Sequence, residues 1–274
     1  MVRTTEDLRS LARNIRKDVL DMTFHAGVEG GHIGGAFSSA DILAALYGSE
    51  MNIDPKNPTD PERDRFLLSK GHISLAHYAV LKECGFLTQA DLDSFENNGS
   101  LFSTHEVMCP EHGIEITSGS LGYGLSIGVG VALRAKQKKQ SYRTFVLLGD
   151  GECNEGGVWE AAMAAARYKL DNLVAIVDKN GQQLDGFTGE VMPIHDMAGA
   201  FKSFGWHTLV IDGHDVEAIQ KSVREKAAGM PTAIIAQTVK GKGLPAIEGK
   251  TGWHHARITQ EQYDAFQQAL EGVR

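Results

Sequence analysis

An acid and an amide stand thirty residues apart in the middle of the chain, each directly after an apolar stretch. Asp150 lies in the segment Gly149-Asp-Gly-Glu-Cys-Asn-Glu-Gly156, and Asn180 ends the segment Asp178-Lys-Asn180. Flanking glycines let the backbone approach a ligand closely. Carboxylate and amide oxygens suit a hard cation such as Mg²⁺, which usually binds together with phosphates. The two segments therefore predict a site for a divalent cation and a diphosphate, although a simple turn is an alternative for 149–151 taken alone.

Other motifs that place acids or glycines around a ligand do not fit. A calcium-binding EF-hand needs glycine at the sixth position of its loop and an acid at the twelfth, whereas Glu155 and Ala161 occupy these positions. The chain has no G-x-G-x-x-G after a strand and no G-x-x-x-x-G-K-[ST]. Nicotinamide-dinucleotide sites and P-loops require these two motifs, so neither type of site is expected.

The acid and the amide each follow a predicted strand. Apolar strands are predicted at 144–148 and 173–177, with an alanine-rich helix at 158–168 between them. Strands that are apolar throughout suit a parallel sheet covered on both faces, and a helical crossover is the usual connection in such a sheet. Ligands of these sheets gather at the carboxyl ends of the strands, where both polar segments fall.

The remaining elements extend this alternating pattern. The sequence predicts further strands at 65–69, 208–211 and 233–237, and further helices at 6–25, 38–47, 72–83, 88–95 and from about Asp215 onward. Ser38 or Ser39 is expected to cap the helix that follows it, and Asp215 the last helix. We expect a single α/β domain over residues 1–274, a doubly wound, mostly parallel sheet with helices on both faces. The glycine-rich stretch 241–255 is expected to form a long functional loop.

The composition restricts the class of protein. The 274 residues carry a formal net charge of −8 and are 42% hydrophobic, as is usual for a globular protein. No basic patch of the kind that binds nucleic acid is evident. The three cysteines form no CxxC pair, the first residues lack an apolar signal-peptide core, and no apolar run reaches 18 residues. We therefore expect a cytoplasmic protein without a membrane or nucleic-acid partner.

Five ordered segments resemble those of transketolases, which depend on thiamine diphosphate. Gly149-Asp-Gly151 followed by Asn180 resembles the thiamine diphosphate-binding motif. The other four segments are Gly31-His-Ile-Gly-Gly35, Ser69-Lys-Gly-His72, Ser118-Gly-Ser-Leu-Gly122 and Val239-Lys-Gly-Lys-Gly243. The resemblance runs from about residue 10 to residue 255. By its closeness, the chain is similar to the N-terminal, diphosphate-binding subunit of split bacterial transketolases.

The resemblance implies a site for thiamine diphosphate and Mg²⁺, in which Ca²⁺ or Mn²⁺ could substitute. The metal would be held by the side chains of Asp150 and Asn180 and by the backbone carbonyl of Gln182. The residues implied to contact the cofactor are His72, Gly119, Leu121, Gly151, Asn180 and His254.

The resemblance also implies a group of catalytic histidines. His32, His72, His105 and His254 would line the substrate channel, where imidazoles can exchange protons with sugar hydroxyls near neutral pH. Glu155 would face a partner and join a carboxylate relay between paired active sites.

The chain departs from the transketolase pattern at three places. Thr104-His-Glu106 stands where Gly-His-Pro is usual, and the stretch to Gly113 is one residue longer, so His112 competes with His105 for the channel role. Trp253-His-His255 has a second histidine where glycine is usual, and Lys179 precedes Asn180 in place of the commoner acid or Asn. The other histidines are expected to be structural, namely His25, His77, His195, His207 and His214.

The resemblance ends before the pyrimidine-binding and C-terminal domains of transketolases. A partner subunit would supply these domains, in an assembly of two plus two chains. With that partner the chain would transfer a two-carbon ketol unit from a ketose phosphate to an aldose phosphate, with pentose phosphates as the default sugars. A transketolase specialised for another ketose is also compatible with the sequence.

Three other functions remain as alternatives. The α subunit of a 2-oxo acid dehydrogenase shares the metal motif, but the segments around His32 and His72 resemble transketolase. A deoxyxylulose-phosphate synthase is usually a single, longer chain. A regulatory module that binds the cofactor without catalysis would not need the full set of histidines and metal ligands.

Overall fold

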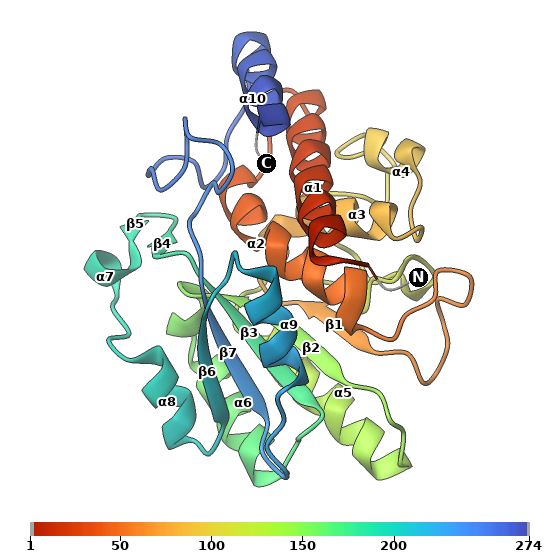
Figure 1. Cartoon of the computed structure of the whole chain (residues 1–274), viewed down its shortest axis with the longest axis vertical. Helices are drawn as coiled ribbons and strands as arrows, with labels where there is room; N and C mark the ends of the chain where they lie inside the picture. The colour runs from red at the N-terminus through yellow and green to blue at the C-terminus, as the bar shows by residue number, and fades with distance from the viewer. Residues whose placement is uncertain (1–2, 273–274) are drawn as a thin grey trace.

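Five parallel strands form the central sheet of the protein (Figure 1). The structure is a computed structural model that describes residues 3–272. The strands are β1 (Arg65–Leu68), β2 (Thr144–Gly149), β3 (Leu173–Lys179), β6 (His207–Asp212) and β7 (Thr232–Gln237). They lie in the order β1-β2-β3-β7-β6, and every neighbouring pair is parallel. A separate antiparallel ribbon consists of β4 (Gln182–Gln183) and β5 (Gly186–Phe187).

Helices connect the strands and cover the sheet. The α-helices are α1 (Thr5–His25), α2 (Ile33–Ala45), α3 (Ser74–Glu83), α4 (Gln89–Asp93), α5 (Gly124–Lys138), α6 (Gly156–Arg167), α7 (Thr188–Val191), α8 (Met197–Ser203), α9 (Val216–Arg224) and α10 (Gln260–Gly272). A π-helical turn (Leu46–Glu50) extends α2, and single 3₁₀ turns lie at Gly71–Ile73, Pro110–His112 and Glu152–Asn154.

The side chains of the central strands alternate between two hydrophobic cores. On β2, Phe145 and Leu147 enter one core, and Val146 and Leu148 enter the other. The first core also contains residues of α1, α2, α3, α9 and α10, and the second contains residues of α5, α6 and α8. Successive residues of a strand point to opposite faces, so both faces of the sheet are buried under helices. The predicted doubly wound, parallel α/β fold is confirmed.

Helix α1 begins where the sequence predicts. Thr4 and Asp7 form a capping box at its start, in which two otherwise unpaired backbone N–H groups receive side-chain acceptors. Its apolar residues are buried with the helical spacing expected from the sequence, and they include Leu8, Ile15 and Val19. Asp215 accepts hydrogen bonds from two backbone N–H groups at the start of α9, so its predicted capping role is confirmed.

The prediction that Ser38 or Ser39 caps a helix is wrong. Helix α2 begins five residues earlier, at Ile33, and all of its residues are buried. The hydroxyls of Ser38 and Ser39 instead donate to the carbonyl of Gly35 at 3.0 Å and to Asp178. Bonds of this kind to a carbonyl one turn earlier let serine remain inside a helix. The residues from Ile33 onward are apolar or small, so they can be buried on every side of a helix. The helix therefore begins before the two serines.

The stretch after β7 forms a long loop, as predicted. Between Thr238 and Thr259 the chain makes turns but no helix or strand. Its end returns to the start of α2, because Gly31 and Ala256 form an antiparallel bridge. This bridge brings the two histidines at 254 and 255 beside the segment that contains His32.

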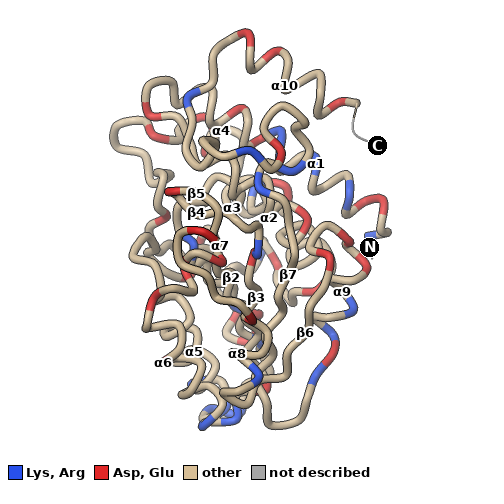
Figure 2. The backbone as a smooth tube through the Cα atoms, turned by 90° about the vertical axis from the view of Figure 1, so that its left-hand side faces the viewer, with Lys and Arg blue, Asp and Glu red and all other residues tan. Residues whose placement is uncertain are grey.

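Charged residues of both signs are distributed along the chain. Figure 2 shows short stretches of Lys and Arg and of Asp and Glu scattered over the backbone. Among residues 3–272, no helix is long and apolar enough to cross a membrane.

Candidate active site

An open cavity of about 360 Å³ lies at the carboxyl ends of β1, β2, β3 and β7. The structure brings ten of the predicted site residues into its lining: His32, His72, His105, Gly119, Leu121, Asp150, Gly151, Asn180, Gln182 and His254. Glu155 is the exception. It is exposed at the start of α6 and does not line the cavity.

Parallel strands bring Asp150 and Asn180 to one edge of the cavity. Gly149 at the end of β2 pairs in register with Asp178 near the end of β3, so the residues that follow both strands are neighbours. Asp150 Oδ2 accepts from the backbone N–H of Gly181 at 2.8 Å. Asn180 Oδ1 accepts from the N–H of Gln182 at 3.1 Å. The predicted acid and amide thus form one connected group.

The surroundings of Asp150 suit a bound cation. The residue is 2% exposed, and no Lys, Arg or His within residues 3–272 forms an ion pair with it. Burial raises the pKa of Asp150, and the nearby carboxylate of Asp178 raises it further. A divalent cation would supply the missing positive charge, because buried carboxylates are normally paired or bind metals.

The cation would need ligands other than acids and histidines. In the described part of the chain, no group of three or more His, Cys, Asp or Glu side chains is arranged to hold a metal ion. One carboxylate, the amide of Asn180 and the carbonyl of Gln182 would leave positions for the oxygens of a diphosphate. This mixed oxygen set is typical of Mg²⁺, which usually binds through few carboxylates together with phosphates.

Two glycines leave space that a side chain would fill. A Cβ on Gly151 would lie 2.8 Å from Cβ of Gln183, directly after Asp150 in the chain. Gly119 has a φ of +143°, which side-chain-bearing residues rarely adopt, and a Cβ there would lie 3.3 Å from the His105 ring. The backbone can therefore approach a ligand at both positions.

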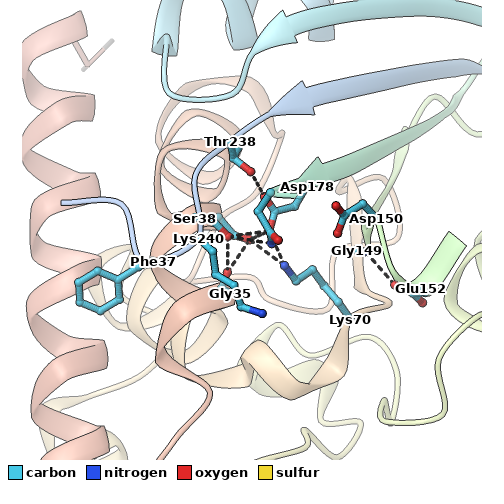
Figure 3. A network of polar contacts seen from close by, with 12 residues as sticks. Gly35, Phe37, Ser38, Lys70, Gly149, Asp150, Glu152, Asp178, Thr238 and Lys240 are labelled. Carbon is cyan, nitrogen blue, oxygen red and sulfur yellow. Dashed lines mark hydrogen bonds and ion pairs between the residues drawn. The ribbon is translucent and has the colours of Figure 1, made fainter. Parts of the chain in front are cut away.

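A buried ion pair lies beneath the cavity (Figure 3). The Lys70 ammonium contacts the Asp178 carboxylate, and the two residues are 1% and 0% exposed. Asp178 also accepts from the hydroxyls of Ser38 and Thr238 and from Asn180 Nδ2 at 3.0 Å. Burial opposes ionisation of Asp178, but Lys70 and these donors hold its pKa below the ordinary value. Through the bond to Nδ2, the network also fixes which side of the Asn180 amide faces the cavity.

Sequence reasoning missed several residues of this site. Lys70, Glu152 and Lys240 line the cavity, and Asp178 lies behind them. The two lysines fall within segments already singled out by their resemblance to transketolase, but the segments did not reveal what the lysines contact. Glu152 is buried and accepts from the backbone N–H groups of Gly149 at 3.0 Å and Gly122 at 2.9 Å. It therefore joins two of the glycine-rich segments.

Five histidine rings gather on one side of the cavity. The ring centre of His32 lies 5.2 Å from that of His72, 6.0 Å from that of His105, 5.2 Å from that of His254 and 4.6 Å from that of His255. The spacing of His32, His72, His105 and His254 matches the predicted group. His255 joins it because the bridge between Gly31 and Ala256 folds the long loop over His32.

The environment favours neutral imidazoles. Burial and the neighbouring His254 lower the pKa of His32 to about 3, and burial and Lys240 lower that of His254 to about 4. Burial and Lys70 lower the pKa of His72 well below its ordinary value. Lys240 has a pKa lowered to about 8 by burial and by Lys70, so it is mostly protonated at neutral pH. The site thus combines neutral proton acceptors with fixed positive charge.

This low pKa predicts an acid-sensitive fold. The unfolded chain binds a proton at His32 below pH 6.5, whereas the folded chain resists it down to about pH 3. The stabilising contribution is therefore complete above pH 6.5 and is lost as the pH falls through this window. We expect His32→Gln to reduce the decrease in melting temperature between pH 7 and pH 4.5. The matched change at exposed His195 should leave that decrease unaltered, and equal decreases in the wild type and His32→Gln would contradict the assignment.

The structure separates the two candidates for the third histidine of the channel. The His105 ring lines the cavity, whereas the His112 ring packs edge-on against Phe102, with a centre-to-centre distance of 5.8 Å. Of the histidines expected to be structural, His77 is fully buried and His214 contacts Asp41 at 2.8 Å. None of those five lines the cavity.

Comparison with known proteins identifies the family. Residues 8–272 match the family model described as transketolase, thiamine diphosphate binding domain. The chain belongs to the transketolase family. It is similar to one subunit of the apulose-4-phosphate transketolase of Phocaeicola vulgatus, with 42% identity over 94% of this chain and 92% of that protein. It is about equally similar to a 6-deoxy-6-sulfo-D-fructose transketolase subunit from Clostridium sp., with 41% identity over 97% of this chain and 96% of that protein.

Full-length transketolases match over a smaller share of their length. Human transketolase is 41% identical over 95% of this chain, which corresponds to 42% of the human protein. The crystal structure of transketolase from Campylobacter jejuni superposes with a TM-score of 0.87 at 30% identity and covers 97% of this chain and 42% of that chain. The chain therefore spans about two fifths of these proteins. The predicted fold and the predicted enzyme class, a transketolase-type transferase that binds thiamine diphosphate, are confirmed.

Proposed function

We propose that this chain is the N-terminal, diphosphate-binding subunit of a split transketolase. With a C-terminal partner subunit it would transfer a two-carbon ketol unit from a ketose phosphate to an aldose phosphate. The observation that carries the proposal is that one cavity is lined both by the acid Asp150 with the amide Asn180 and by histidines, of which His32 and His254 have lowered pKa values. Two relatives of nearly the same length, each described as a transketolase subunit, support the split arrangement.

The acid and the amide are proposed to hold Mg²⁺. Asp150 and Asn180 would contribute side-chain oxygens, and Gln182 would contribute its backbone carbonyl. Gly151 would lie against the diphosphate, while His72 and His254 would contact it from the histidine side. Thiamine diphosphate, when bound, supplies the nucleophilic carbon and the electron sink that cleavage of the ketose C2–C3 bond requires.

Gly119 and Leu121 are proposed to contact the other end of the cofactor. Both line the cavity, and Gly119 exposes its backbone because it carries no side chain. They belong to the glycine-rich segment that Glu152 holds beside the end of β2. The cofactor would therefore span from the acid of one segment to the backbone of the other.

The histidines are proposed to handle protons of the sugars. A neutral imidazole of His32, His72 or His254 can accept the proton of a ketose hydroxyl as the C2–C3 bond breaks and can donate to the aldehyde acceptor in the second half-reaction. The His105 ring lines the same cavity and would contact the sugar beside them. Lys240 lies 3.1 Å from His254 Nδ1 and would orient this ring while attracting anionic groups. No protein-derived oxidant or reductant is required for these steps.

An exposed apolar surface supports a partner chain. Tyr123 and Ile127 on or beside α5 and Met163 and Tyr168 on or beside α6 are exposed, and the two helices pack against each other. Leu184 at the cavity mouth is 69% exposed. Large apolar side chains exposed on neighbouring helices are typical of interaction sites. A partner that carries the pyrimidine-binding and C-terminal domains would cover it and close the cavity, and Glu155 would face this partner in a two-plus-two assembly.

The substrate class is proposed to be ketoses and aldoses with an anionic end. The names of the two relatives of similar length specify apulose-4-phosphate and 6-deoxy-6-sulfo-D-fructose, which carry a phosphate and a sulfonate. Lys240 lines the cavity and would attract such an anionic group, whereas the charge of Lys70 is neutralised by Asp178. Pentose phosphates are the first substrates to test, and a specialised ketose is the second.

The proposal predicts activity only in a mixture of two subunits. We expect no ketol transfer from xylulose 5-phosphate to ribose 5-phosphate by this chain alone with Mg²⁺ and thiamine diphosphate, because the chain corresponds to 42% of full-length transketolases. Addition of the product of the adjacent gene should restore transfer, measured by the formation of sedoheptulose 7-phosphate. Full activity of the isolated chain would contradict the split arrangement. Transfer from another ketose, but not from xylulose 5-phosphate, would support the specialised form.

A further inference from the structure

A chain of three buried polar side chains lies next to the cavity but outside its lining. The Tyr47 hydroxyl lies 2.7 Å from His77 Nε2, and His77 Nδ1 lies 2.6 Å from Glu106 Oε2. Tyr47, His77 and Glu106 are 7%, 0% and 1% exposed. Buried polar groups are costly unless they are hydrogen-bonded, so these three residues depend on one another.

One proton arrangement satisfies both contacts. If His77 carries its proton on Nδ1, it donates to the Glu106 carboxylate, and Nε2 accepts from the Tyr47 hydroxyl. Burial, followed by the carboxylate of Glu106, raises the pKa of Tyr47 well above its ordinary value, so the hydroxyl keeps its proton. In this arrangement Tyr47 donates to His77, and His77 donates to Glu106.

Glu106 connects this core to the cavity. It directly follows His105, whose ring lines the cavity, while the Glu106 side chain points into the core. The Glu106 carbonyl also accepts from the backbone N–H of Ser118 at 3.1 Å. The His105 ring lies close to Gly119, the next residue in that segment. Residue 106 thus contacts the buried His77 through its side chain and the glycine-rich segment through its backbone, directly beside a cavity histidine.

Glu106 keeps its backbone free to rotate, so its side-chain contacts must hold it in place. One of its carboxylate oxygens is buried without a hydrogen-bond partner among residues 3–272. A buried acid with this cost requires a compensating gain. We propose that His77 and Glu106 are positioning residues that hold His105 in the cavity, with Tyr47 as the outer end of this chain of three side chains. This inference rests on the proposed function, in which His105 faces the sugar.

The test uses the two-subunit enzyme. Glu106→Ala is expected to lower kcat/KM for ketol transfer by roughly 10- to 100-fold, as a displacement of about 1 Å can, and to leave the affinity for Mg²⁺ and thiamine diphosphate unchanged. Glu106→Gln retains an acceptor for His77 Nδ1 and should recover most of the loss. In a His105→Ala background, Glu106→Ala should change kcat/KM less than twofold, because the positioned ring is already absent.

Asp64→Asn provides a matched control. Asp64 is also a buried acid, 3% exposed and paired with Arg143 at 3.0 Å, but it precedes β1 and lies outside the cavity lining. Asp64→Asn should lower the stability of the fold. Any change that it causes in kcat/KM should be the same in the wild type and in the His105→Ala background. The inference would be overturned if Glu106→Ala lowered kcat/KM by the same factor in the wild type and in His105→Ala. It would also be overturned if Glu106→Ala left kcat/KM at the wild-type value.

A second measurement does not depend on turnover. In spectra of nitrogen-15 histidine in the full chain, we expect a protected Nδ1–H signal of His77 and one sharp set of His105 ring signals. Glu106→Gln should retain both features, whereas Glu106→Ala should remove the first and broaden or split the second. An unchanged His105 ring in Glu106→Ala would overturn the positioning role. This result can be read even if the wild-type mixture transfers no ketol unit, an outcome that would count against the proposed function alone.

Discussion

Replacement of Asp150 by alanine is expected to lower ketol transfer in the two-subunit mixture by on the order of 10³-fold. Asp150 is the buried acid of the proposed cation-binding group and has no ion-pair partner among the described residues. Loss of its carboxylate would remove the main protein charge that holds a divalent cation, and such a cation contributes several kcal/mol to catalysis, which corresponds to this change in rate. The measurement is transfer from xylulose 5-phosphate at saturating thiamine diphosphate.

The control for this prediction is Asp185→Ala. Asp185 lines the same cavity but is exposed, so its removal should change the rate by less than about threefold. A titration with Mg²⁺ should separate a loss of binding from a loss of fold, because Asp150→Ala should require much more metal while its melting temperature without metal remains near that of the wild type. Equal rates for Asp150→Ala and the wild type would reject the metal site.

Replacement of Lys70 by methionine is expected to produce the largest loss of stability. The Lys70 side chain is 1% exposed and faces Asp178, which is fully buried. Removal of one partner of a buried ion pair leaves the other charge uncompensated and costs about 3–5 kcal/mol. Urea unfolding of Lys70→Met should therefore show a midpoint far below that of the wild type. The same variant should bind the cofactor weakly, since Asp178 also holds the Asn180 amide.

Two further variants test the cause of this loss. In Lys70→Met with Asp178→Asn no charge remains buried, so the double variant should be more stable than Lys70→Met alone. Lys136→Met removes a comparable but exposed pair with Asp171, 2.8 Å apart, and should cost no more than about 1 kcal/mol. If both lysine variants lost the same stability, burial would not explain the effect.

The sequence alone determined the five strands of the central sheet, several of the helices and the edge of the sheet at which ligands are expected to bind. Apolar stretches of strand length predicted β2 and β3, and the alanine-rich stretch between them predicted α6. Because these strands are parallel, their carboxyl ends meet at one edge, so Asp150 and Asn180 could be placed together. The glycine-rich segments and their histidines were also visible, since each is a short run of consecutive residues.

Only the tertiary structure decided which buried charges and hydroxyls meet. Lys70 and Asp178 are 108 residues apart, and Ser38 and Asp178 are 140 apart, so local spacing carries no information about either contact. The prediction that Ser38 or Ser39 caps a helix was wrong for this reason. A serine that donates to a carbonyl inside α2 cannot be distinguished by sequence from a serine that caps a helix. His77 was likewise expected to be merely structural, and its link to Glu106 depends on how α3 packs beneath the loop.

The elements could be predicted and the buried contacts could not, and this difference has one physical origin. Periodicity and strand direction are local properties of the backbone, which consecutive residues encode directly. Pairing of buried polar groups is a property of the packed core, where each donor takes whichever acceptor the surrounding helices leave within reach. The sequence of this chain therefore determined where its site lies and which motifs form it. The packing of α2, α3 and the long loop after β7 determined how the ring of His105, the amide of Asn180 and the two buried lysines are held there.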